Sequence, residues 1–274
     1  MRIWIPTRGR YIQTTYNSLP PEIQKEVAFV VSHKEDPENL PEGAKWVHSH
    51  TDGIAAKRQW IIDNSPDKCI MLDDDLVFAT RRDDDPTKFL PSTGYDIVRL
   101  FSNIDGLLDR FCHVGVSCRE GANRDTVDTV VNSRILRVHG FGADVLRREG
   151  VRFDRLEFMT DFDVTLQLLE KGYANIRINW IVQNQKSSNA PGGCSLYRTI
   201  DKLRESAIEL MRLHPQFVKL VEKETKGAWN GQPRTDVRIA WKAAFDSAGK
   251  VAVLDSRTQP DNVEERPGAT ETVE

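Results

Sequence analysis

The sequence is poor in cysteine and has no long apolar run, and each shortage excludes a class of protein. Only four cysteines occur among the 274 residues, and no two of them form a Cys-x-x-Cys pair. A zinc knuckle and a disulfide framework are therefore both excluded. No apolar run approaches the length of a membrane span, and the opening MRIWIPTRGR has too short an apolar stretch for a signal peptide. We expect a reduced, cytoplasmic protein with no membrane partner.

An excess of positive charge is also missing. The 38 lysines and arginines are outnumbered by 41 aspartates and glutamates, which gives a formal net charge of −3. Contact with a nucleic acid would therefore need a locally basic surface. Hydrophobic residues at 39% and charged residues at 29% are typical of an ordinary globular protein. We expect a single domain over residues 1–249, with a core over about 1–200 and a helical part over about 200–249, followed by a disordered tail at 250–274.

Short apolar runs in the first half predict an α/β fold. Residues 2–6, 26–32 and 45–49 have strand character, and the wholly apolar CIML at 69–72 is typical of a strand inside a parallel sheet. A helix is expected at 53–63, between the third and fourth strands. This alternation predicts a Rossmann-like, mostly parallel central sheet with flanking helices. Further helices are expected at 161–171, 200–213 and 215–226.

Three adjacent aspartates, Asp73, Asp74 and Asp75, follow the CIML strand. Carboxylates side by side repel one another, so a divalent cation is the obvious partner. In an extended chain Asp73 and Asp75 share a face and converge on one ion, while Asp74 points away. A second run at 83–85 lies among arginines with no strand leading into it. We interpret that second run as a solvated acidic turn and the first as a site for Mn²⁺ or Mg²⁺.

Basic groups and glycines occur at positions that would meet the same end of the sheet. Arg8 and Arg10 follow the first strand, and Lys57 and Arg58 lie in the first turns of the helix before the aspartates. Together they would neutralise a diphosphate beside a metal, although each alone is typical of a surface charge. The loop at 183–195, with Arg198 after it, is compatible with a segment that covers a ligand or with an ordinary surface loop. Its glycines, Gly192 and Gly193, would allow the backbone to approach a ligand closely.

The motif TDFD opens the helix expected at 161–171. One interpretation is structural, with Thr160 or Asp161 capping the helix and Asp163 favouring its dipole. The other makes one of these carboxylates a general base that takes a proton from an acceptor hydroxyl. The residues alone leave both interpretations open.

The order of these motifs resembles that of nucleotide-sugar glycosyltransferases of the GT-A fold. IPTRGR matches the nucleotide-contacting loop, GIAAKRQW the helix before the metal strand, MLDDD the DxD motif and TDFD the acidic catalytic motif. The opening MRIWIPTRGR, the motif order and the short length most resemble the TET-associated glycosyltransferases, a bacteriophage group. The resemblance spans about residues 1–200. It implies transfer of a sugar, from a UDP-sugar as the expected donor, to 5-hydroxymethylcytosine in DNA, in the host cytoplasm if a phage encodes the chain.

The resemblance also implies a role for individual residues. Asp75, with Asp73, would ligate the metal. Asp73 would alternatively meet the ribose or a metal-bound water, and Asp161 would be the base. Many GT-A enzymes have Glu-Asp where this chain has Thr160-Asp161, so the base could instead be Asp163, or the enzyme could retain stereochemistry. The expected nucleotide-sugar contacts are Pro6, Thr7, Arg8, Arg10, Lys57, Arg58, Asp73, Asp74, Gly192, Gly193 and Arg198.

The acceptor and two other classes of function remain open at this stage. A basic stretch fits contact with a phosphate backbone, although acidic residues alternate within it; its arginines are Arg134, Arg137, Arg147, Arg148, Arg152 and Arg155. A glycan or a small molecule is the alternative acceptor. A sugar-1-phosphate nucleotidyltransferase would need a lysine in a glycine-rich loop after the first strand, and TRGR has none. A non-catalytic nucleic-acid-binding module would need a strongly basic chain.

Overall fold

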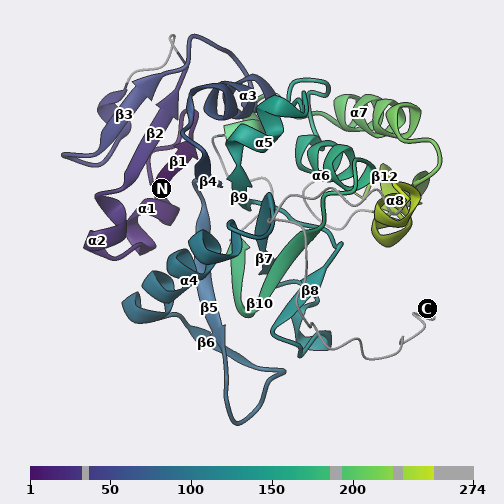
Figure 1. Cartoon of the computed structure of the whole chain (residues 1–274). Helices are drawn as coiled ribbons and strands as arrows, with labels where there is room; N and C mark the ends of the chain where they lie inside the picture. Colours follow the sequence, from purple (N-terminus) through teal and green to yellow (C-terminus); the bar gives the residue numbers. More distant parts are fainter. Residues whose placement is uncertain (33–36, 186–192, 225–230, 250–274) are drawn as a thin grey trace.

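The computed structural model describes residues 1–32, 37–185, 193–224 and 231–249, and within them the chain folds around one large sheet (Figure 1). The strands lie in the order β3-β2-β1-β4-β9-β7-β10-β5-β6, with β8 paired to β10. Helices cover the sheet, so the expected α/β class with a central sheet is confirmed. Position 192 and the tail at 250–274 lie outside the described residues.

The first four strands pair in parallel and bring their carboxyl ends to one edge. They are β1 (Arg2–Pro6), β2 (Val27–Val31), β3 (Lys45–His48) and β4 (Lys68–Leu72). β1 lies between β2 and β4, and β3 lies beyond β2. The strand expectations for this half are confirmed, and the loops that follow β1 and β4 become neighbours at the edge where ligands of open α/β sheets bind.

The second half of the sheet is largely antiparallel. Its strands are β5 (Leu76–Arg81), β6 (Phe89–Pro91), β7 (His113–Cys118), β8 (Thr129–Val131), β9 (Val138–Gly142) and β10 (Asn175–Gln185). β9 lies antiparallel between β4 and β7, whereas β7 and β10 run parallel. Because β9 is antiparallel to β4, the chain enters β9 beside the loop that leaves β4.

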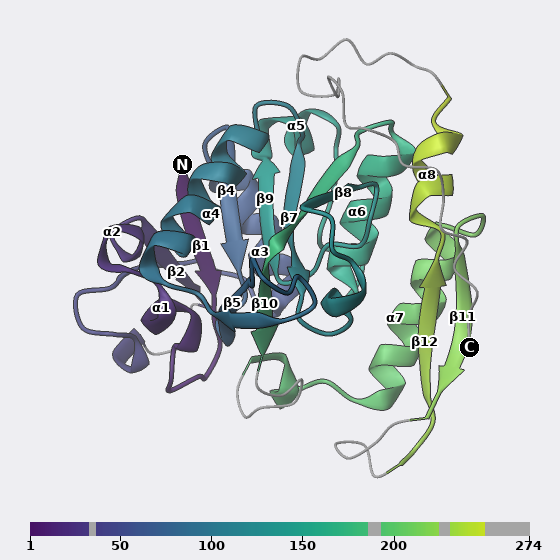
Figure 2. The ribbon, with the colours of Figure 1, turned by 90° about the horizontal axis from the view of Figure 1, so that it is seen from below.

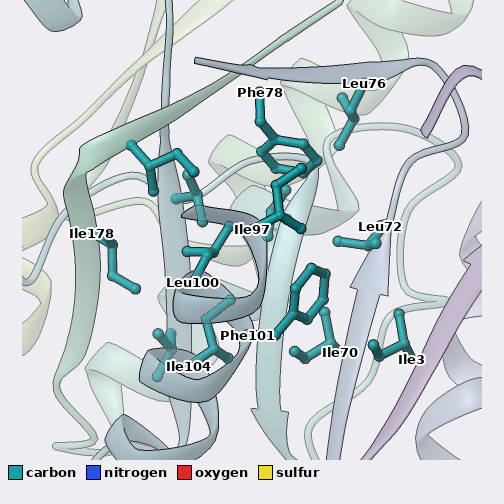
Figure 3. Close-up of a cluster of buried hydrophobic side chains, with 14 of the residues drawn as sticks. Ile3, Ile70, Leu72, Leu76, Phe78, Ile97, Leu100, Phe101, Ile104 and Ile178 are labelled. Atoms are coloured by element: carbon teal, nitrogen blue, oxygen red, sulfur yellow. The ribbon is translucent and has the colours of Figure 1, made fainter. Parts of the chain in front are cut away.

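Alternate residues of each strand pack on opposite faces of the sheet. Ile3, Ile70 and Leu72 face α4 (Gly94–Leu107), whose apolar side chains form one core with them (Figure 3). Trp4 and Met71 face the other way and pack on α3 (Ile54–Asn64), α5 (Ala143–Arg148) and α6 (Thr160–Glu170). The short helices α1 (Thr14–Ser18) and α2 (Pro21–Gln24) connect β1 to β2. Single 3₁₀ turns lie at Pro37–Asn39, Ala122–Arg124 and Gly193–Leu196.

The last described part combines helices with a hairpin that lies beyond the central sheet (Figure 2). It consists of α7 (Ile200–Leu213), β11 (Val218–Lys223), β12 (Arg234–Ile239) and α8 (Trp241–Ser247). The helix expected at 215–226 is therefore wrong. The segment Val218–Lys223 is instead a strand that pairs with β12 in antiparallel register. No helix in the described part of the chain is long and apolar enough to cross a membrane.

His214 joins this C-terminal part to α6. Its ring is 2% exposed and contacts Asp163 Oδ1 through Nε2 at 2.8 Å and Glu170 Oε1 through Nδ1. Burial disfavours the charged ring, but the two carboxylates outweigh burial and raise the pKa of His214. The protonated ring is thus the form that ties the end of α7 to both ends of α6.

We expect His214→Gln to destabilise the fold in a pH-dependent manner. Because the folded pKa is raised, the contribution of His214 is complete below the unfolded pKa of about 6.5 and is lost as the pH rises through the folded value. The variant should lose about 2–4 kcal/mol of unfolding free energy at pH 6 and clearly less at pH 9. Urea titrations at both pH values measure the difference, with His50→Asn as the surface control. An equal loss at both pH values would contradict the assignment.

Candidate active site

A cavity of about 350 Å³ lies at the carboxyl ends of β1 and β4. Its volume is within the range of small-molecule sites. The lining comes mainly from Pro6, Thr7, Arg8 and Arg10 after β1, from Gly53, Ile54, Lys57 and Arg58 at the start of α3, from residues 73–75 after β4, from residues 158–162 at the start of α6, and from Gly193, Cys194, Ser195, Tyr197 and Arg198. The structure thus brings together every expected site residue except Asp163 and Gly192, and the latter lies outside the described residues.

The aspartate run forms a turn, and the expectation that Asp74 points away is wrong. Asp74 is 6% exposed; its Oδ2 accepts a hydrogen bond from Thr7 Oγ1 at 2.6 Å, and its Oδ1 lies 2.7 Å from Arg10 Nε. Burial raises the pKa of Asp74 to about 6, against the opposing effects of Arg10 and Thr7. The carboxylate in the middle of the run therefore fastens the loop after β1 to the turn after β4.

Thr15, which the sequence did not single out, holds the backbone of this turn. Its Oγ1 donates to Asp73 O at 2.5 Å and accepts from Leu76 N at 2.8 Å, while its own amide donates to Asp74 O at 3.1 Å. No motif marks Thr15, because its partners lie about 60 residues away along the chain. The side chain is fully buried. The shape of the aspartate turn thus depends on a hydroxyl supplied by α1.

Arg58 bridges the aspartate turn and the start of α6. Nη2 donates to Asp73 Oδ1 and Nη1 donates to Thr160 Oγ1, each at 2.9 Å. Burial disfavours the guanidinium charge, but Asp73 and Asp161 outweigh it and raise the pKa of Arg58. Thr160 therefore accepts from Arg58 and makes no side-chain cap, contrary to one interpretation of TDFD.

Lys57 precedes this arginine and has a different partner. Its side chain is 2% exposed, and Nζ donates to the backbone carbonyl of Thr7. A buried ammonium needs such partners, because burying it unpaired would be costly. Lys57 lines the cavity and also supports the loop after β1 from beneath.

α6 begins in a strained conformation that directs Asp161 towards the cavity. Met159, at the N-cap, has φ 59° and ψ 24°, in the left-handed region that non-glycine residues avoid. Burial raises the pKa of Asp161, Arg58 lowers it, and Asp73 raises it further. Asp161 lines the cavity, as Arg58 does.

Asp163 does not contribute to the cavity, so its assignment as an alternative base is not supported by its position. The side chain is completely buried and contacts His214, Gln167 and Arg155. Two positions along an α-helix correspond to a rotation of about 200°, so Asp161 and Asp163 face opposite sides of α6. Asp163 joins α6 to the C-terminal part.

Gly193 and the residues after it form the wall opposite the helices. The amide of Gly193 donates to Arg8 O at 2.7 Å. The ring of Tyr197 stacks on Phe158 at 5.6 Å, the guanidinium of Arg8 lies 5.2 Å from the Tyr197 ring, and that of Arg198 lies 5.4 Å from Phe158. These contacts pack both guanidinium groups against aromatic rings that line the cavity or lie beside it.

The carboxylates at the cavity fit a hard divalent cation only in part. Asp73 and Asp75 have side chains 29% and 17% exposed, and both line the cavity with oxygen donors. Among the described residues, no group of three His, Cys, Asp or Glu side chains is placed to hold a metal. Mg²⁺ commonly binds one or two carboxylates together with substrate phosphates and water. The two aspartates therefore fit a cation that the substrate helps to hold.

The basic stretch expected to contact DNA is largely neutralised within the chain. The contacts are Arg137 with Glu120 and Gln183, Arg147 with the carbonyls of Ile62 and Ser65, Arg148 with Glu149, Arg152 with Asp154, and Arg155 with Asp163. Arg137, Arg147 and Arg155 thus contact residues distant in sequence, whereas Arg148 and Arg152 pair with acidic neighbours on the surface.

Comparison with known proteins assigns the class of the enzyme. The family model described as TET-Associated Glycosyltransferase matches residues 1–193. The model describes a family of glycosyltransferases, the class that the sequence predicts. The chain belongs to the TET-associated glycosyltransferase family.

Two further comparisons add little to this assignment. No curated protein matches the chain. Among solved structures, it is similar to the crystal structure of S. aureus TarS 1–349, with 12% sequence identity and a TM-score of 0.42. That match covers 77% of this chain and 66% of the other, so the chain spans slightly less than two thirds of that structure.

Thr15→Val tests the support of the aspartate turn. The change keeps the shape of the side chain but leaves Leu76 N and Asp73 O without their hydroxyl partner, which should cost about 1–3 kcal/mol of unfolding free energy. Thr14→Val, at the half-buried position before it, should cost much less. Thermal or urea unfolding measures both variants. Equal stabilities would show that the hydroxyl does not support the turn.

Proposed function

We propose that the enzyme moves a sugar from a nucleotide-sugar donor, with a UDP-sugar expected, to the hydroxyl of 5-hydroxymethylcytosine in DNA, with Mn²⁺ or Mg²⁺ as cofactor. The observation that carries the proposal is the position of Arg58, which contacts Asp73 on one side of the cavity and Thr160 on the other. The expected donor-side and acceptor-side carboxylates thereby belong to one cavity.

The donor side is supported by the charges that line the cavity. Arg8, Arg10 and Arg198 all reach it, and a diphosphate needs such groups to offset its negative charge. Asp73 and Asp75 would hold the cation. When bound, the divalent ion supplies electrostatic stabilisation of the departing diphosphate. The arginines orient the phosphates, and the aspartate turn fixes the distance between donor and acceptor sides.

The acceptor side is supported by Asp161. An alcohol is a poor nucleophile at neutral pH, and a positioned carboxylate assists its deprotonation. Burial raises the pKa of Asp161 and makes it a stronger base, while the charge of Arg58 opposes that rise. Asp161 would accept the hydroxyl proton as the sugar is transferred, and Arg58 would then stabilise the surrounding charges.

The choice of DNA as acceptor is supported by the family to which the chain belongs. The family is described as TET-associated, and the resemblance implies an oxidised pyrimidine. A hydroxymethyl group inside a duplex cannot enter a cavity, so the target nucleotide would have to be extruded from the stack. A hydroxyl of a glycan or small molecule is the competing acceptor.

Asp75→Asn tests the metal-dependent part of donor binding. UDP with Mn²⁺ should raise the melting temperature of the wild-type protein, by an amount equivalent to about 2.7 kcal/mol at a ligand concentration of 100 Kd. Chelation should remove most of that shift, and the variant should lack it. Asp83→Asn, from the exposed second aspartate run, should behave like the wild type. Unchanged metal-dependent stabilisation in Asp75→Asn would refute the assignment.

Asp161→Asn tests the reaction. The amide keeps the shape but cannot accept the proton, so the rate should fall by roughly two to four orders of magnitude with donor affinity nearly intact. The assay incubates enzyme, Mn²⁺ and a panel of nucleotide sugars with hydroxymethylated and unmodified DNA. The DNA is then digested to nucleosides, and their masses are measured by mass spectrometry. Asp201→Asn, on the exposed start of α7, is the control.

Two outcomes would separate the parts of this proposal. Transfer by Asp161→Asn at the wild-type rate would exclude Asp161 as the base. Labelling of a glycan or small molecule, with no adduct on hydroxymethylated DNA, would replace the acceptor and leave the donor site intact. A sugar adduct confined to hydroxymethylated DNA is the expected result.

A further inference from the structure

Arg10 lies directly over the aspartate turn and contacts two of its carboxylates. Nε lies 2.7 Å from Asp74 Oδ1, and Nη2 lies 3.3 Å from Asp75 Oδ2. The side chain is only 13% exposed. Arg58 meets the third carboxylate, that of Asp73. Every aspartate of the turn therefore already has a guanidinium partner from within the chain.

The terminal nitrogen of Arg10 also lies against the wall that begins at Gly193. A Cβ added to Gly193 would lie 3.1 Å from Arg10 Nη2, so the absence of a side chain allows this close approach. The backbone φ of Gly193 is +61°, which independently favours glycine. Nη2 thus pairs with Asp75 and lies near Gly193, while Nε pairs with Asp74.

A divalent cation at Asp75 would compete with this nitrogen. Two positive groups a few ångströms apart repel strongly where water is scarce. The contact with Asp75 is the longer of the two ion pairs and lies at the more exposed carboxylate, although it has hydrogen-bond geometry and the Nε–Asp74 ion pair does not. Asp74 is held by Thr7 as well. The guanidinium fork can release one acceptor and keep the other, which the point charge of a lysine cannot do.

We infer that Arg10 is the resident cation of the aspartate turn, that it yields Asp75 to the incoming metal while Nε remains on Asp74, and that its freed Nη2 then binds the diphosphate of the donor. The inference rests on the metal site of the proposed function. Arg10 would thus act first as a positioning residue for the metal and then as a group that binds the donor.

The test measures Mn²⁺ binding without any nucleotide. Free Mn²⁺ is followed by electron paramagnetic resonance during titration of the wild type, Arg10→Gln and Arg82→Gln. Arg82 pairs with Asp84 on the surface and is the matched control. Arg10→Gln should bind Mn²⁺ about tenfold more tightly, because the ion no longer displaces a cation. Arg82→Gln should match the wild type.

A second measurement excludes a merely structural role. At saturating Mn²⁺, Arg10→Gln should bind UDP about tenfold more weakly, because the diphosphate loses Nη2. Opposite changes in the two affinities follow from the exchange, whereas a damaged site would weaken both. Arg10→Lys, which keeps the charge, should fall between the wild type and Arg10→Gln for Mn²⁺ and replaces Arg10→Gln if that variant does not fold.

Three results would overturn the inference. Equal or weaker Mn²⁺ binding by the folded Arg10 variants would show that Arg10 does not compete with the ion. Absence of Mn²⁺ binding in all the proteins, both without nucleotide and with saturating UDP, would remove the metal on which the inference depends. Unchanged UDP affinity in Arg10→Gln would exclude the diphosphate contact. Sugar transfer by the wild type in any of these cases would leave the proposed reaction standing while the role of Arg10 fails.

Discussion

The arrangement of the site depends on a buried guanidinium that must find acceptors on two sides. Arg58 leaves α3 near its start and meets Asp73 after β4 and Thr160 at the start of α6. Because an unpaired charge at this depth would be strongly destabilising, both segments are held within reach of one planar group. The pKa of His139 is lowered well below its usual value, mainly by burial and then by His113, and the charge of Arg58 lowers it further. The buried ring of His139 therefore stays neutral. Of these two buried side chains, only Arg58, which lines the cavity, carries a positive charge.

The placement of the motifs could be predicted from the sequence, because it follows from short-range rules. Apolar runs identified the parallel strands, and the carboxyl ends of such strands share an edge, so the aspartates and the basic loop had to meet. The conformation of the aspartates could not be predicted in this way. An extended chain would turn Asp74 outwards, but Thr7 and Thr15 bend the run into a turn and bury Asp74. Those contacts join residues about 60 apart in sequence, and no local pattern reports them.

The C-terminal part shows the same limit in another form. VKLVEK has helix-forming lysine and glutamate, and only its pairing with β12 reveals a strand. The two carboxylates of TDFD look equivalent as first-turn residues of a helix. Their separation of two positions already implies opposite faces, yet which face meets the cavity depends on His214, which lies 51 residues beyond Asp163. The sequence therefore predicts that Asp161 and Asp163 face opposite sides of the helix. Only tertiary contacts show which of the two faces the cavity.

The left-handed backbone of Met159 has a consequence for how α6 is set in place. A glycine there would remove a conformational cost on the order of 1 kcal/mol, yet the side chain of Met159 packs into the apolar cluster shared by α6, α7 and β11. Packing of the Met159 side chain therefore helps to fix the position and the rotation of the first turn of α6. Packing in the C-terminal part thereby influences where the first turn of α6, with Asp161, lies at the cavity, although that part contributes few cavity residues itself.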